Sequence, residues 1–169
     1  MNTEPNLANF WNVDLSGMLP YFRYIWVKAL RSGDYKQGRS QLFIKDWMDD
    51  SYCCLGVLCD ITAVGEWRSY GTEDEEEYGR TYCVHDSPLL AGYDLKNSSP
   101  ILYESEERLP ALLRAFFDIP EDTEERLMQL NDGDEHTERL NFNDIADIIE
   151  DSLIADGYSI KELEAKYGN

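Results

Sequence analysis

Residues 19–33 read LPYFRYIWVKALRSG, and this stretch decides the expected fold. Apolar side chains recur in it at helical spacing: Phe22, Ile25, Trp26, Ala29 and Leu30. Pro20 suits the first turn of a helix, where a backbone N–H has no intrahelical partner. Gly33 favours a stop, because glycine tolerates the left-handed backbone of a C-terminal cap. The stretch therefore predicts an amphipathic helix over 19–30 whose apolar face lies in the core.

Outward from this helix, the chain alternates between short strands and further helices. Alternating and β-branched residues predict strands over 40–45 (SQLFIK), at 52–53 after a turn at 49–51, and over 81–85. Apolar periodicity predicts helices over 54–64, 109–117, 120–130 and 141–157, and a last helix from 159. Asn141 with Asp144, and Ser159 with Glu162, have the residue types and spacing of N-terminal capping pairs.

These elements predict a single compact domain of the α+β class over 1–169, mainly helical with a small antiparallel sheet. Residues 1–18 are expected to form a short helix or arm that packs on the same core. The stretch 71–79 (GTEDEEEYG) is expected to be an acidic loop, because its five consecutive carboxylates repel one another in any compact element.

Charge is the outlying feature of the composition. The 169 residues include 34 Asp and Glu against 15 Lys and Arg, for a net charge of −19. The stretch 118–156 alone holds fourteen acidic residues and only Arg126 and Arg139 as bases. Because nucleic-acid backbones and anionic membranes attract positive surfaces, this balance argues against direct binding to either one.

The N-terminus and the cysteines together indicate an intracellular setting. Residues 1–10 lack the basic and apolar regions of a signal peptide, and no apolar run is long enough to span a membrane. Three of the four cysteines, Cys53, Cys54 and Cys59, fall within one apolar stretch. We therefore expect a cytoplasmic protein whose thiols are free and mostly buried.

Two motifs resemble those of a known family. Residues 26–38 (WVKALRSGDYKQG) match the pattern W-V-x-A-L-R-S-G-x-Y-x-Q-G, and residues 53–60 (CCLGVLCD) follow it. Leu130-Asn131-Asp132 and residues 142–150 (FNDIADIIE) resemble the closing signatures of the same family. It is a set of small proteins common in bacteriophages and their hosts. The resemblance implies a shared fold and a phage-type origin, and it implies no particular activity.

The segment 31–39 (RSGDYKQGR) is the first candidate site. Its glycines permit tight turns whose backbone N–H groups can bind anions. Its polar side chains are candidates to hold a nucleotide-like anion: Arg31, Tyr35, Lys36, Gln37 and Arg39. The alternative is that the same residues pair with acidic helices and tie down the loop, so that they serve the fold instead.

Metal and catalytic motifs give weaker signals. The paired spacing of a structural zinc site is not found among Cys53, Cys54, Cys59, Cys83 and His85. A calcium loop that starts at Asp132 needs glycine at its sixth position, where the sequence has Thr137. We expect no metal and no cofactor. Cys83 with His85 is the one candidate pair for a small enzyme, and it matches no known catalytic motif.

The leading hypothesis is a phage-type, non-catalytic protein that counters host defence through its acidic surface. Its carboxylates imitate phosphates and occlude a basic host protein that binds nucleic acid. The carboxylates assigned to this surface are Glu73, Asp74, Glu75, Glu76, Glu77, Glu121, Asp122, Glu124, Glu125, Asp134 and Glu135.

Overall fold

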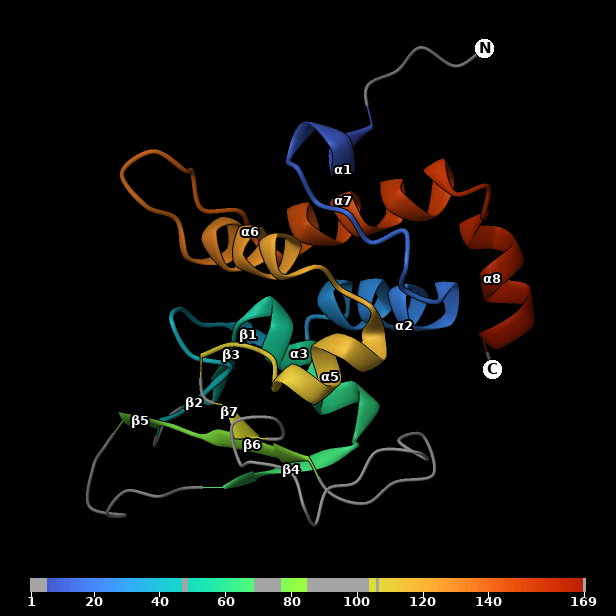
Figure 1. Cartoon of the computed structure of the whole chain (residues 1–169). Helices are drawn as coiled ribbons and strands as arrows, with labels where there is room; N and C mark the ends of the chain where they lie inside the picture. The colour runs from blue at the N-terminus through green and yellow to red at the C-terminus, as the bar shows by residue number, and fades with distance from the viewer. Residues whose placement is uncertain (1–5, 47–48, 69–76, 85–103, 106, 169) are drawn as a thin grey trace.

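The computed structural model describes residues 6–46, 49–68, 77–84, 104–105 and 107–168. Figure 1 shows helices on one side of the molecule and two small sheets on the other, with α3 and α5 between them. The arrangement is α+β and mainly helical, as predicted. No helix in the described residues is long and apolar enough to cross a membrane.

Helix α2 (Pro20–Arg31) lies at the centre of the helical side and confirms the helix predicted over 19–30. Its buried residues include Phe22, Trp26 and Leu30, and the Trp26 indole donates a hydrogen bond to the Cys54 carbonyl at 2.9 Å. Gly33 has a φ of 81°, the left-handed conformation expected of a helix stop.

Helix α7 (Phe142–Ala155) packs along α2. The predicted capping box forms, since the Asn141 and Asp144 side chains each accept a hydrogen bond from the other's backbone N–H. Helix α8 (Ile160–Tyr167) follows. Its N-cap residue, Ser159, makes no side-chain capping bond, so the second predicted capping pair is wrong.

The described strands form two sheets. The first has the order β1-β3-β2-β5 and the second β4-β6-β7. Their bounds are β1 Lys36–Gln37, β2 Phe43–Asp46, β3 Ser51–Tyr52, β4 Gly65–Arg68, β5 Glu77–Gly79, β6 Thr81–Val84 and β7 Glu104–Ser105. The pair β1–β3 is parallel, whereas we expected only antiparallel pairing. The strand over 77–79 also corrects the prediction that 71–79 is all loop.

Helix α3 (Cys54–Thr62) is buried along its first six residues, 54–59, and lies between the two halves of the molecule. It lies so close to the chain before β2 that a Cβ on Gly56 would come within 1.8 Å of the Leu42 carbonyl oxygen. Glycine is therefore required at the centre of the CCLGVLCD motif for a steric reason.

Helices α5 (Ala111–Phe117) and α6 (Glu121–Asp132) follow, with Pro120 as the N-cap residue of α6. The short helix α1 (Leu7–Phe10) lies against α7, where the Asp151 carboxylate accepts a hydrogen bond from the Leu7 N–H at 3.1 Å. The described part of the N-terminal arm thus packs on the core, as expected.

Candidate functional site

Arg31, the first residue of the predicted anion site, is held by two carboxylates of α7. Its Nη2 atom lies 2.6 Å from Asp147 Oδ1 and 2.5 Å from Glu150 Oε2. The Arg31 side chain is 34% exposed, so water still screens these ion pairs. An anion that approached Arg31 would therefore meet two fixed negative charges beside one positive charge.

Tyr35 and Gln37 are also engaged in the fold. The Tyr35 hydroxyl donates to Asp60 at 2.6 Å, and the Trp67 indole donates to the other oxygen of the same carboxylate. The Gln37 side-chain amide donates to Asn131 Oδ1 at 3.0 Å. Gln37 thereby links β1 to the C-terminal end of α6.

Three of the five predicted ligand residues nevertheless line one hollow of about 320 Å³. Its walls are Leu30, Arg31, Gly33, Tyr35, Gln37, Asn141, Phe142 and Asn143. Lys36 and Arg39 are exposed outside it, and the Lys36 ammonium lies 3.8 Å from Asp49. The positive charges that sequence reasoning assigned to an anion are thus dispersed or already paired with carboxylates.

The four thiols are free and buried, as expected. Burial raises the pKa of Cys53 to about 12 and that of Cys59 well above its ordinary value, which keeps both thiols protonated. His85, the proposed partner of Cys83, lies outside the described residues. Among those residues no three His, Cys, Asp or Glu side chains gather as metal ligands would.

Helix α6 carries four of the acidic residues assigned to the partner surface, and one of the four, Glu124, is buried. Glu121, Asp122 and Glu125 are exposed. Glu124 is only 1% exposed, where it accepts hydrogen bonds from the Leu109 N–H and the Arg114 guanidinium. It is therefore a structural carboxylate and does not belong to the partner surface.

The loop after α6 adds further exposed carboxylates. Asp134 accepts hydrogen bonds from the backbone N–H groups of His136 and Thr137, which lower the pKa of Asp134. Glu135 is exposed beside it. The predicted partner residues 73–76 lie outside the described residues. Glu77 lies in β5, where the backbone register places it opposite Asp46 of β2.

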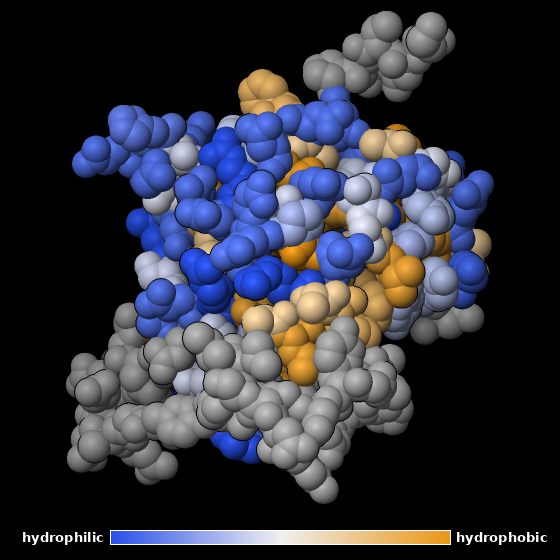
Figure 2. Space-filling model, in the orientation of Figure 1, coloured by the Kyte–Doolittle hydropathy of each residue, from blue (hydrophilic) through white to orange (hydrophobic). Residues whose placement is uncertain are grey.

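Several exposed carboxylates in the acidic stretch 118–138 have no basic partner among the described residues. Within the described ranges, no Lys or Arg lies in salt-bridge distance of Asp118, Asp122, Glu125, Glu135 or Glu138, all of which are exposed. Figure 2 shows hydrophilic residues gathered over the part of this face where α6 and the loop after it lie in Figure 1. Exposed carboxylates without a basic partner among the described residues thus lie before α6, on its first turns and in the loop after it.

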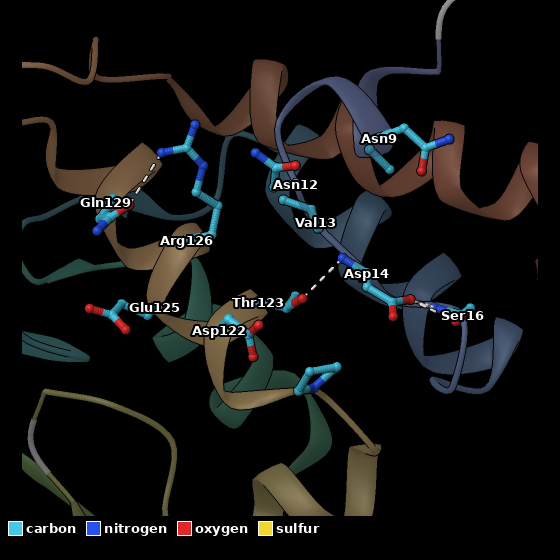
Figure 3. Close-up of a pocket in the computed structure, with 12 residues that line it drawn as sticks. Asn9, Asn12, Val13, Asp14, Ser16, Asp122, Thr123, Glu125, Arg126 and Gln129 are labelled. Atoms are coloured by element: carbon cyan, nitrogen blue, oxygen red, sulfur yellow. Dashed lines mark hydrogen bonds between the residues drawn. The ribbon is translucent and has the colours of Figure 1, made fainter.

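A groove of about 940 Å³ lies where this part of α6 meets the N-terminal arm (Figure 3). Its walls are Ala8, Asn9, Asn12, Val13, Asp14, Ser16, Pro120, Asp122, Thr123, Glu125, Arg126 and Gln129. Sequence reasoning missed this groove, because nothing local in residues 8–16 shows which helix the arm lies against. The acidic residues at 122 and 125 were the only part of its lining that sequence reasoning assigned.

The model of a domain of unknown function, DUF8296, matches residues 18–153. The chain belongs to this family. The DUF8296 match runs from the turn before α2 to the last part of α7, and so includes α3, α6 and both quoted motifs. No curated protein and no solved structure matches the chain.

Proposed function

We propose that this protein binds a basic, nucleic-acid-binding host protein through its acidic surface and so counters host defence without catalysis. The observation that carries the proposal is the set of exposed carboxylates on α6 and the following loop that lack a basic partner among the described residues. Unpaired surface charges of one sign reduce the stability of their own fold, yet they favour association with an oppositely charged partner.

The mechanism is occlusion. Nucleic acid presents closely spaced negative charges, and proteins hold it with clusters of lysine and arginine. Exposed carboxylates at 121, 122 and 125 present negative charge along the first turns of α6, and Asp134 and Glu135 extend it past the end of the helix. A partner that pairs its basic cluster with these groups cannot hold nucleic acid there at the same time. The interaction takes place in the cytoplasm of the host cell.

The alternative, a nucleotide-like ligand in the hollow beside Arg31, has less support. The two carboxylates that hold Arg31 give that corner a net negative charge, and Gln37 is committed to Asn131. A dianionic phosphate would have to displace one of these partners. The hollow therefore fits the fold-stabilising reading of the motif better.

A displacement assay tests the proposal. Labelled duplex DNA is bound to a purified basic nucleoid protein, and its fluorescence anisotropy is followed as this protein is added. We expect release of the DNA, and release at severalfold higher protein concentration for the double variant Asp122→Asn/Glu125→Gln. The control Asp34→Asn/Glu162→Gln removes the same charge from exposed positions outside 118–156 and should behave as the wild type.

Two outcomes would contradict the proposal. One is that none of a panel of basic nucleic-acid-binding proteins releases its DNA. The other is that both double variants release DNA as well as the wild type does.

A further inference from the structure

The N-terminal arm runs antiparallel to the first turns of α6 and is fastened to it at two points. The Asp14 N–H donates to Thr123 Oγ1 at 3.0 Å, and the Arg126 Nε–H donates to the Trp11 carbonyl at 2.8 Å. The anchor residues are three positions apart on each side, which places them about 4.5 Å apart along the helix. The groove described above is therefore bounded by walls that are already fixed to each other.

The two ends of this groove differ in chemistry. Asp14 and Asp122 lie on opposite walls at one end, where they offer acceptors only (Figure 3). Ser16 donates to the Asp14 carboxylate through its hydroxyl and its backbone N–H, and these bonds lower the pKa of Asp14. The Asp14 carboxylate therefore keeps its negative charge at neutral pH.

The other end offers hydrogen-bond donors. Asn12, Arg126 and Gln129 line it, and the Glu125 carboxylate lies on the same side in Figure 3. Gln129 lies about 10 Å along α6 from Asp122. The Arg126 guanidinium is held in place by the Trp11 carbonyl and by Gln129 Oε1 at 3.2 Å, and it stacks over the Trp11 ring. It thus stays at its own end and is not free to neutralise the acidic end.

We infer that this groove receives an extended segment of the basic partner. A lysine or arginine side chain of that segment lies between Asp14 and Asp122, and peptide carbonyls accept hydrogen bonds from the donors at the other end. This inference rests on the proposed function. The groove is then the part of the acidic surface that selects the partner, and the ion pairs of its basic side chain with Asp14 and Asp122 provide the selection.

Size and composition fit such an occupant. A volume of about 940 Å³ lies at the upper end of the range of ordinary ligand pockets, and the lining mixes three carboxylates and three amides with apolar atoms of Ala8, Val13 and Pro120. Apolar atoms can contact the methylene stem of a basic side chain while its charged head meets the carboxylates. Walls that are fixed before binding also reduce the entropy lost on association.

The test uses two short synthetic peptides, one with a central arginine and one with citrulline in its place. Citrulline keeps the shape of arginine and removes its charge. Each peptide is titrated into the nitrogen-15-labelled full chain. We expect the arginine peptide to shift the side-chain amide signals of Asn9, Asn12 and Gln129, and to bind at least about tenfold more tightly than the citrulline peptide, as a charge-assisted pair requires.

Two variants distinguish binding in the groove from attraction to the negative charge of the whole protein. Asn9→Trp fills the groove from an exposed position of α1 without a change of charge, and it should abolish the shifts at Asn12 and Gln129. Asp122→Asn should weaken binding of the arginine peptide about tenfold, because it removes one charged acceptor. Asp34→Asn is the matched control, and it should bind as the wild type. Thermal unfolding of each variant confirms that it is folded.

Equal affinity for the two peptides, or shifts spread evenly over the loop after α6 and α8, would overturn the groove as the binding site. DNA release that persists in Asn9→Trp would also overturn it, and it would leave the proposed function intact. Failure of the displacement assay with every basic protein would instead overturn the proposed function itself.

Discussion

The side-chain oxygen of Asn131 accepts a hydrogen bond from the backbone N–H of Cys54 at 3.1 Å, and neither group touches solvent. This contact joins the last turn of α6 to the first turn of α3. The same oxygen accepts from Gln37, and the Asn131 amide donates to the Gly38 carbonyl at 2.8 Å. Residues of three separate stretches of the sequence, 26–38, 53–60 and 130–132, thus converge on one buried amide.

Asn131→Ala is therefore expected to destabilise the fold strongly. The change leaves two buried polar groups, the Cys54 N–H and the Gly38 carbonyl, without this partner, at about 1 kcal/mol or more each, for a total of about 2 kcal/mol or more. The Gln37 amide keeps its hydrogen bond to the Leu140 carbonyl at 2.8 Å. Urea unfolding measures the effect as a lower midpoint. Asn143→Ala, at an exposed position near the start of α7, is the matched control and should change the midpoint little. An equal fall of the urea midpoint in both variants would show that Asn131 does not hold α6, α3 and the segment 37–38 together.

Gly56→Ala should prevent stable folding. The new Cβ would meet the Leu42 carbonyl carbon and oxygen, which are backbone atoms that cannot rotate away. Losses above about 4 kcal/mol are exceptional for single substitutions, and this one belongs in that class. At Gly33 a Cβ meets no atom within 4 Å, so Gly33→Ala carries only the backbone strain of its φ of 81°, about 1 kcal/mol. Circular dichroism and urea unfolding compare the two variants.

The four cysteines should stay unreactive toward a thiol reagent at pH 8 in the native protein. All four are buried, which keeps the reagent away from them. Burial also raises the pKa of Cys53 to about 12 and the pKa values of Cys54 and Cys59 well above the ordinary value, so these three thiols carry almost no thiolate. Unfolding in urea should expose all four thiols to rapid reaction. A thiol that reacts quickly before unfolding would contradict the burial and would reopen the possibility of a catalytic cysteine.

Deprotonation of Glu124 should lower the free energy of unfolding as the pH rises above about 4.5, the ordinary pKa of a glutamate. Burial raises the pKa of Glu124 although Arg114 opposes the shift, so the folded state retains this proton longer than the unfolded state does. The stabilising contribution is complete below the unfolded pKa and is lost as the pH rises through the folded pKa. Unfolding free energies of wild type and Glu124→Gln between pH 4 and 7 should diverge in this direction, and parallel pH profiles would contradict it.

ATP, as a test nucleotide, should not raise the melting temperature of the wild-type protein. Arg31 is the basic residue among those described that line the hollow, and its guanidinium is already paired with Asp147 and Glu150. A phosphate in the hollow would therefore find no unpaired cation among these lining residues. Ligand binding to the native state would stabilise it by mass action. A concentration-dependent rise that disappears in Arg31→Gln would restore the nucleotide alternative.

The sequence predicted the helices well because their signals are local. Apolar periodicity marks α2 and α7, and the Asn141–Asp144 pair marks the start of α7. Strand β4 was missed because its alternation covers only four residues, GEWR, which is too short a run to indicate a strand without the pairing with β6. The parallel pair β1–β3 likewise depends on a long-range contact between residues 36–37 and 51–52.

The candidate site was predictable only in part. Glu124 was assigned to the surface because it stands in an acidic run, yet Thr123, Leu127 and Asn131 show that it shares the buried face of α6. The helical period could have revealed this error. The groove could not be predicted, because it exists only where the arm at 11–14 meets α6 at 123–126.

The central claim is that unpaired carboxylates on α6 bind a basic partner, and the salt dependence of binding tests it most directly. The affinity for a basic nucleoid protein is measured over a series of salt concentrations for the wild type, Asp122→Asn/Glu125→Gln and the control Asp34→Asn/Glu162→Gln. We predict that affinity falls steeply with salt for the wild type and the control, and that the slope is shallower for the α6 variant. An affinity that does not depend on salt, or equal slopes for all three proteins, would contradict the claim.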